Sequence, residues 1–129
     1  KADGIYKGDF LKWNPTSGSS YIAIGNPPFG KNSSLAVKFF NRCSLFCDVI
    51  AFVLPKTFRK TSLINRLAKS HHLMYDMDMP KDSFIFESIS YDVPCCFQIW
   101  KKEPHTREKI KVLNFNSFEG LLSNSLISR

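Results

Sequence analysis

The sequence predicts an α/β fold. Short apolar runs at residues 21–25 and 49–54 each end at Gly or Pro, which is typical of buried strands that enter tight loops. Helical periodicity separates these two runs and recurs after the second, and two further β-rich runs follow it. The order is therefore strand, helix, strand, helix, strand, strand. Such an order is typical of α/β proteins, and here it predicts that the last two strands pair antiparallel.

The first helix is predicted between the two apolar strands. Ser33 or Ser34 is a suitable N-cap, and the apolar side of the helix continues to about Cys47. The run at 49–54 is continuously apolar, which predicts a strand in a parallel sheet that is covered on both faces. Pro55 ends this strand because proline cannot donate to the ladder.

The second half of the chain continues the pattern. A helix is predicted at 58–70, a strand at 72–79, a long loop or hairpin at 80–92, and the final strand at 93–102. The tail at 103–129 is polar at first and then partly apolar, and we place no element in it.

Composition favours a folded protein with an anionic partner. Of the 129 residues, 43% are apolar and twelve are Phe, which is enough for one packed core. No apolar run approaches the ~18–20 residues of a membrane span, so no membrane partner is expected. The net charge is +7, which suits nucleic acid, and the densest basic stretch is residues 101–111.

The four cysteines give no metal-binding pattern. Cys43 and Cys47 are expected on one helix face, and Cys95 and Cys96 on opposite faces of a strand. We interpret all four as small buried residues of a cytoplasmic protein in a reducing environment, and we predict no metal cofactor. Three histidines also lack partners at ligand spacing, two expected at a helix end and one in a polar loop: His71, His72 and His105.

The segment Asn26-Pro27-Pro28-Phe29, with a glycine on each side, carries the most chemistry. Proline locks its own φ and pushes the preceding residue toward extended geometry, so this corner has few conformations. The prolines donate no N–H, and the corner is therefore rich in acceptors: the Asn26 side-chain oxygen and the carbonyls of Asn26 and Pro27. Beside the ring of Phe29, these acceptors suit a flat group that carries an NH2, such as the amino edge of a base.

A phosphate loop fits the same residues less well. Residues 25–31 match the spacing G-x-x-x-x-G-K, but Asn32 stands where Ser or Thr would bind Mg²⁺. A phosphate cradle works through backbone N–H groups, and Pro27 and Pro28 remove two of them. The sequence therefore favours amine recognition over phosphate binding at this corner.

The corner resembles motif IV of the amino-methyltransferases, Asn/Asp/Ser-Pro-Pro-Tyr/Phe, as in the adenine-N6 DNA enzymes of restriction-modification systems. Gly8-Asp9-Phe10-Leu11-Lys12-Trp13 is similar to their motif III. Residues 48–55 and the Lys-Thr-Phe that follows are similar to their next strand and loop, so the resemblance covers roughly residues 5–102. It implies S-adenosylmethionine-dependent methyl transfer to an exocyclic amine, with adenine N6 in DNA as the first expectation.

The resemblance also implies a fold and a domain division. The expected fold is a partial Rossmann-like class I methyltransferase sheet, made of the four strands from motif IV onward, with the final strand antiparallel. Residues 1–129 would form one partial catalytic domain. In this division, 1–20 hold motif III and a loop, 21–102 form the α/β core, and 103–129 are the C-terminal tail.

For the methyl acceptor, the resemblance implies roles at the corner itself. The Asn26 side-chain oxygen and the Pro27 carbonyl would hold the two N–H bonds of the amine, and Pro28 would keep the corner stiff. Phe29 would stack on a base that has left the duplex. Phe84 or Phe86 would form the second wall of the base pocket.

For S-adenosylmethionine, the resemblance implies that Asp9 accepts a hydrogen bond from the adenine amino group of the cofactor. Phe10 would pack near that ring, and Asn26 would lie between the cofactor and the methyl acceptor. These residues supply only one end of a cofactor site.

One part of the family pattern is missing from the 129 residues. The six glycines form no G-x-G, whereas the resemblance implies a glycine-rich loop around the methionine end of the cofactor. We therefore expect the chain alone to be inactive. We also expect the strand at 21–25 to be an unpaired edge, covered by an N-terminal half, by the tail or by a second copy. The alternatives are RNA adenine-N6 methyl transfer, protein glutamine methyl transfer, or a non-catalytic subunit that binds nucleic acid or a partner protein.

Overall fold

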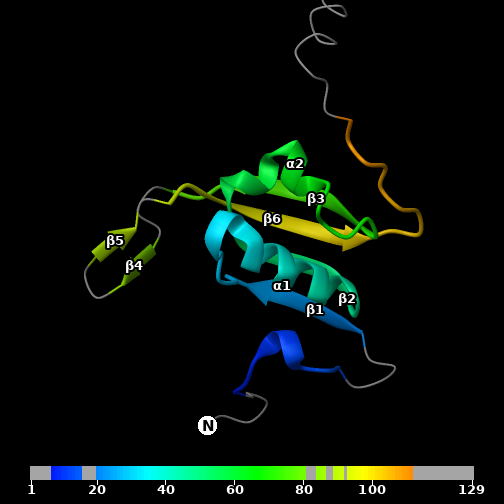
Figure 1. The fold of residues 1–129 in the computed structure, drawn as a ribbon, viewed down its shortest axis with the longest axis horizontal. Helices are drawn as coiled ribbons and strands as arrows, with labels where there is room; N and C mark the ends of the chain where they lie inside the picture. Colours follow the sequence, from blue (N-terminus) through cyan, green and yellow to red (C-terminus); the bar gives the residue numbers. More distant parts are fainter. Residues whose placement is uncertain (1–6, 16–19, 81–83, 87–88, 92, 112–129) are drawn as a thin grey trace, which may run out of the picture.

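The computed structural model describes residues 7–15, 20–80, 84–86, 89–91 and 93–111 (Figure 1). Its elements are η1 (Phe10–Lys12), β1 (Tyr21–Gly25), η2 (Lys31–Ser33), α1 (Ser34–Ser44), β2 (Cys47–Pro55), η3 (Lys56–Arg59), α2 (Thr61–Ile64), β3 (His71–Asp78), β4 (Phe84–Phe86), β5 (Ile89–Tyr91) and β6 (Cys95–Lys102). The expected α/β order is therefore confirmed for these residues.

A mixed sheet with the strand order β1-β2-β6-β3 forms the centre of the fold. β1 and β2 are parallel, and β6 runs antiparallel between β2 and β3. The prediction of an antiparallel final strand is thus confirmed. β4 and β5 form a separate antiparallel hairpin within the segment that was expected to be a loop or hairpin.

The buried core lies on one face of this sheet. Ile50, Phe52 and Leu54 alternate along β2 and are at most 5% exposed. They pack with residues of α1 and of the α2 region, and Figure 1 shows α1 lying across β2. The rings of Phe40 and Trp100 meet edge to face at 5.2 Å in the same cluster. Burial of large aromatic side chains on this face is a major source of stability.

The opposite face of the sheet is more open among the described residues. The strand residues of the buried cluster share the face that α1 covers, whereas Val49 and Val53 on the other face of β2 are half-buried. On the same open face, Ile22 and Ile24 are 65% and 78% exposed. The continuous apolar run of β2 predicted cover on both faces. On this face Ala51 is only 8% exposed, whereas Ile22 and Ile24 on the neighbouring strand stay open.

A chain of side-chain hydrogen bonds links the buried part of β6 to β3 at the edge of the sheet. The Trp100 indole N–H donates to Gln98 Oε1 at 2.9 Å, and Gln98 Nε2 donates to Asp76 Oδ2 at 3.2 Å. Arg59 then closes on Asp76 through two nitrogens and also pairs with Asp78. The Arg59 and Lys56 charges hold the pKa of the Asp78 carboxyl below its ordinary value. Every polar group of the buried Gln98 side chain is thereby satisfied.

The first helix begins close to the predicted residue and ends earlier than predicted. α1 starts at Ser34, but Ser33 at the N-cap position has φ 63° and makes no side-chain capping bond. Its hydroxyl lies 2.7 Å from the hydroxyl of Thr57 instead. Cys47 belongs to β2, so the expectation that it shares a helix face with Cys43 is wrong. The helix stops because Cys47 begins the pairing with Tyr21 on β1.

The second helix is much shorter than predicted. α2 covers Thr61–Ile64, and residues 65–70 follow as turns. Side chains from distant segments bind the backbone there: Asn41 Oδ1 accepts from Ala68 N–H, and Asn41 Nδ2 donates to the Arg66 carbonyl. Arg107 also donates to carbonyls at the end of this stretch, among them that of Ala68. These tertiary hydrogen bonds replace those of a continued helix.

All four cysteines are buried free thiols, as the sequence predicted. Burial, with the neighbouring Cys47 as a further cause, raises the pKa of the Cys43 thiol to about 12. Burial likewise raises the pKa of Cys96 to about 11. Such thiols stay protonated at neutral pH and pack as small apolar groups.

His71 lies at the start of β3 and is fully buried, so the expectation that it ends a helix is wrong. Its Nε2–H donates to the Cys47 carbonyl at 2.8 Å, which leaves Nδ1 to accept from the Ser70 hydroxyl at 2.9 Å. Burial lowers the pKa of His71, while the bond to the Cys47 carbonyl opposes that shift. The folded state therefore favours the neutral form of the His71 imidazole.

We expect the protein to lose stability as the pH falls below the ordinary histidine pKa of 6.5 because of His71. The unfolded chain takes up this proton at a higher pH than the folded chain, so stability rises with pH across that window. The charges near the ring are those of Lys102, Asp48 and His72, and Arg107 binds the His71 carbonyl. The largest slope for one proton is about 1.4 kcal/mol per pH unit.

Urea unfolding at about pH 7.5 and about pH 5.5 measures this effect. A His71→Gln variant keeps a donor for the carbonyl and should show a smaller difference between the two pH values. His105→Gln is the control, because His105 is exposed. An unchanged pH dependence in His71→Gln would contradict the assignment.

Candidate functional site

The Asn-Pro-Pro-Phe corner lies where β1 ends, and the loop after β2 lies beside it. β1 runs parallel to β2, so the carboxyl ends of both strands meet at one edge of the sheet. Ligand sites of open α/β sheets form at such edges. The hydrogen bond between Ser33 and Thr57 joins the two loops directly.

The corner is tied to the start of α1. The Phe29 carbonyl accepts from the backbone N–H groups of Leu35 and Ala36 at 3.1 and 3.2 Å. Gly30 has φ 72° and ψ −178°, a conformation that is almost exclusive to glycine. Two residues of the next turn, Asn32 and Ser33, also have positive φ values of 54° and 63°. The two backbone hydrogen bonds to the Phe29 carbonyl thus hold the loop, including Asn32 and Ser33 in the left-handed region.

A cavity of about 380 Å³ opens at this corner. Asn26, Pro27 and Pro28 line it together with Phe10 of the motif III segment. Ile22 and Ala23 also line it, although they lie on opposite faces of the sheet, so the cavity runs along the outer edge of β1. Among the described residues, β1 pairs only with β2, as expected of an edge strand.

The acceptors of the corner differ in exposure. Asn26 is exposed, and its side chain makes no hydrogen bond with any described residue. Pro27 is buried and Pro28 is exposed. Asn26 thus lines the cavity with a side chain that is open to solvent.

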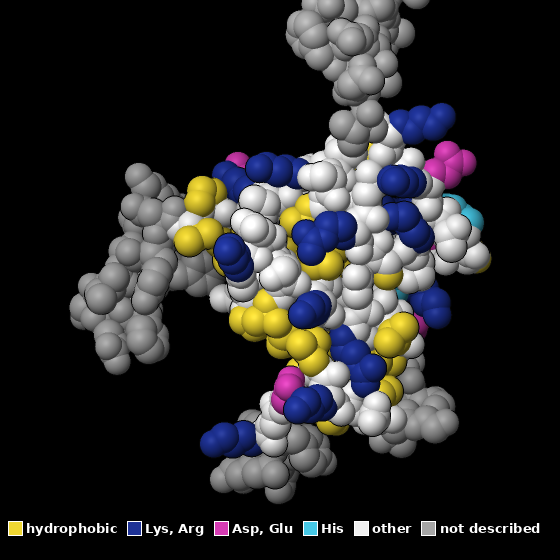
Figure 2. All heavy atoms as spheres, viewed as in Figure 1, with side chains coloured by type: hydrophobic (Ala, Val, Ile, Leu, Met, Phe, Trp, Pro, Cys, Tyr) yellow, Lys and Arg dark blue, Asp and Glu magenta, His cyan; other side chains and the backbone are white. Residues whose placement is uncertain are grey.

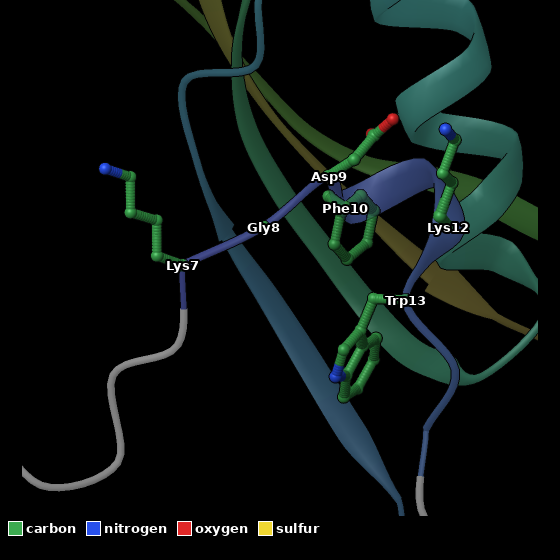
Figure 3. A pocket seen from close by; sticks show the side chains of 6 residues that line it. All are labelled: Lys7, Gly8, Asp9, Phe10, Lys12 and Trp13. Carbon is green, nitrogen blue, oxygen red and sulfur yellow. The ribbon is translucent and has the colours of Figure 1, made fainter.

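A second cavity, of about 460 Å³, lies along the motif III segment (Figure 3). Asp9 caps the turn of η1 by accepting from the Leu11 N–H at 3.0 Å through Oδ1. In Figure 3, the rings of Phe10 and Trp13 lie together, and the Asp9 carboxylate points away from them. Phe10 lines both cavities, so the segments with Asp9 and Asn26 meet across its ring.

Aromatic contacts hold the motif III segment against α1. Phe10 stacks on Phe39 at 5.4 Å, and Trp13 meets Phe46 edge to face at 5.4 Å. Arg42 on α1 donates to the Trp13 carbonyl and to Asn14 Oδ1. Trp13 and Phe39 were not among the predicted site residues. The signal that could have found Trp13 is its spacing from Phe10, three residues apart in the segment 8–13.

Of the three phenylalanines expected to stack on the base, the structure describes the side chain of Phe29 but not those of Phe84 and Phe86. Phe29 is half-buried, and its ring packs against the hydrophobic core rather than lining either cavity. Phe84 and Phe86 belong to β4, but their side chains lie outside the described residues. Figure 1 shows the β4–β5 hairpin at the end of the sheet where β1 also ends.

The basic stretch expected to face nucleic acid contains a structural residue. The Arg107 guanidinium lies 5.2 Å from the Trp100 ring and donates to the His71 carbonyl at 2.7 Å. It also donates to the carbonyls of Leu67 and Ala68. Burial lowers its pKa. Arg107 therefore anchors the segment after β6 to the fold.

No three His, Cys, Asp or Glu side chains among the described residues are placed to hold one metal ion. No helix in the described part of the chain is long and apolar enough to cross a membrane. Comparisons of the whole chain with protein-family models, with curated proteins and with solved structures found no match.

Proposed function

We propose that this chain forms the amine-binding part of an S-adenosylmethionine-dependent methyltransferase that acts on adenine N6 in DNA. The main support is one juxtaposition: Asn26, Pro27 and Pro28 directly follow β1 and line a cavity together with Phe10. The sheet is compatible with the resemblance, because its final strand, β6, runs antiparallel to both of its neighbours, β2 and β3.

The corner suits a weakly nucleophilic amine. The lone pair of an adenine N6 is delocalised into the ring. Acceptance of its two N–H bonds by the Asn26 side-chain oxygen and the Pro27 carbonyl favours a pyramidal nitrogen with a localised lone pair. S-adenosylmethionine supplies an electrophilic methyl group on its sulfonium. The contribution of Asn26 and Pro27 is positioning and electrostatic stabilisation, without a strong base.

The residues present fit one end of the cofactor. Phe10 offers a ring face between the two cavities, and Asp9 is among the residues that line the larger one, with its carboxylate directed away from the rings of Phe10 and Trp13. Oδ1 of Asp9 is engaged by the Leu11 N–H, and Oδ2 makes no hydrogen bond with a described residue. An adenine amino group has a suitable acceptor there. The 129 residues contain no G-x-G pattern for the methionine end, so we propose that other residues complete that part.

The edge of β1 supports the same division. Ile22 and Ile24 of β1 are 65% and 78% exposed. Among the described strands, β1 pairs only with β2, so its outer edge pairs with none of them. Exposed apolar edges of this kind are templates for strand pairing. We propose that a further segment, either an N-terminal half or a second copy, pairs with β1 and closes the cavity that runs along it.

A methyl-transfer assay tests this function. The complete product of the reading frame that contains this chain is incubated with tritiated S-adenosylmethionine and DNA, and the labelled nucleosides are separated. We expect label in N6-methyladenine, and no turnover by the 129 residues alone. Parallel incubations with RNA and with protein test the alternatives, and label in RNA adenine or protein glutamine there would replace DNA as the substrate. Binding of DNA without any methyl transfer would favour the alternative of a non-catalytic subunit. The absence of a G-x-G pattern from the 129 residues is the observation that supports this alternative.

A further inference from the structure

A third hollow, separate from the two cavities described above, lies between the loops that follow β1 and β2. Its volume is about 320 Å³. It is lined by two cations, three neutral hydrogen-bonding side chains and one leucine: Asn32, Thr57, Lys60, Ser62, Leu63 and Arg66. None of its lining residues is acidic, so an anion that enters it meets no like charge.

The walls of this hollow are fixed by contacts within the protein. Ser33 Oγ and Thr57 Oγ1 are 2.7 Å apart and join the loop of the Asn-Pro-Pro-Phe corner to η3. Asn32 is held at φ 54° and ψ 33°, in the left-handed region. The cluster is therefore a shaped recess in which side chains from two loops and α2 converge. Dihedral strain of this kind is often associated with a functional loop.

The two cations of the hollow are uncompensated. Among the described residues, the ion pairs join Lys56 and Arg59 to Asp76 and Asp78. The side chains of Lys60 and Arg66 take part in none of these pairs, and both residues are exposed. Figure 2 shows Lys and Arg side chains across the face that carries α1 and α2, with acidic side chains mainly toward its margins.

We propose that this hollow binds a backbone phosphate of the nucleic acid strand. Arg and Lys give charge-assisted hydrogen bonds to phosphate oxygens, and Ser, Thr and Asn side chains commonly add neutral donors that fix the strand in register. Asn32 belongs to the same loop as Asn26, so a strand held here runs past the amine-binding corner. The choice of a nucleic acid strand rests on the proposed function, whereas the preference for a phosphate group rests on the hollow itself.

Binding of a fluorescent single-stranded DNA oligonucleotide to the 129-residue chain, without cofactor, tests the proposal. Anisotropy is measured between about 50 and 200 mM salt. The pocket variant combines Lys60→Gln with Arg66→Gln. The control combines Lys101→Gln with Lys109→Gln, which removes the same charge from exposed positions outside the hollow.

We expect the pocket variant to bind about tenfold more weakly, and its slope of log Kobs against log salt to fall by about 0.7 for the lost phosphate contact. The control should bind within about threefold of the unmodified chain. Ser62→Ala removes no charge and should weaken binding with an unchanged slope. Equal losses in the pocket and control variants would show that binding depends on diffuse charge, and would overturn the proposal.

Two further measurements complete the test. One distinguishes a free phosphate from a strand phosphate, and the other separates the phosphate site from the proposed methyltransferase function. If inorganic phosphate or adenosine monophosphate competes as strongly as the oligonucleotide, the hollow binds a free phosphate group and the strand assignment is wrong. Circular dichroism confirms that each variant is folded. Because no methyl transfer is measured, a selective loss in the pocket variant stands even if the methyltransferase assignment fails. Conversely, if the complete protein transfers methyl groups but the pocket and control variants bind DNA equally well, the phosphate site is rejected and the methyltransferase proposal stands.

Discussion

Replacing Asn26 by alanine is expected to lower methyl transfer to DNA by about 10²-fold or more in the active protein. The substitution removes the side-chain oxygen that we propose to accept an N–H of the amine. Loss of one preorganised polar contact to a reacting group commonly costs 10²–10³-fold in turnover. Asn26 is exposed and bonds to no described residue, so the melting temperature should change little.

Asn26→Asp is the matched variant for this experiment. It keeps a side-chain acceptor at the same position, and the motif that the corner resembles accepts Asp there. We expect Asn26→Asp to retain much more activity than Asn26→Ala under the same conditions. Initial rates with tritiated S-adenosylmethionine give the comparison. Nearly normal turnover by Asn26→Ala would sink the role of this residue in catalysis.

Replacing Gly30 by alanine is expected to destabilise the fold by about 2–5 kcal/mol. Two causes act together. The backbone at φ 72° and ψ −178° strains any residue with a Cβ. A Cβ built there would also lie 2.6 Å from Leu35 Cβ and 3.0 Å from the Leu35 backbone nitrogen. The collision falls on α1, whose first turn is tied to the Phe29 carbonyl.

Gly25→Ala provides the control for Gly30→Ala. Gly25 ends β1, and a Cβ built there meets nothing within 4 Å. In a strand, alanine is more favourable than glycine by roughly 0.5–1 kcal/mol, so this variant should be neutral or slightly stabilising. Urea unfolding of both variants measures the difference. A Gly30→Ala variant as stable as Gly25→Ala would mean that the loop relaxes into another conformation.

Local sequence patterns predicted the strands well because apolar runs and their Gly or Pro ends act over a few residues. Residues 21–25 form β1 as predicted, and β2 and β6 include the predicted cores of their strands. The antiparallel direction of β6 was also predicted. The placement of β6 between β2 and β3 has no local signal in the sequence.

The length predicted for the second helix was wrong because long-range contacts decide where this helix ends. The apolar spacing of Leu63, Ile64 and Leu67 permits a helix to residue 70. In the structure, Asn41 and Arg107 bind the backbone of that stretch from positions far away in the sequence. A local pattern contains no information about such partners.

The candidate site was predicted in part for the same reason. Proline chemistry made the acceptors of Asn26 and Pro27 readable from the sequence. Neither the left-handed backbone of Asn32 nor the convergence of Lys60 and Arg66 on it has a local signature. The overall charge indicated an anionic partner, but the densest basic stretch contains Arg107, which serves the fold.

The central position of β6 also sets an order of events during synthesis. This strand is the last of the sheet to leave the ribosome, yet its Gln98 and Trp100 are buried at the middle of the core. The pairing of β6 with β2 closes a long loop, as Val49 meets Lys101, and such non-local pairing slows folding. Until Lys102 has been made, β2 and β3 have no common neighbour. During that interval, the edge of β2 that later pairs with β6 is open, and such unpaired strand edges are where a nascent chain is prone to aggregate.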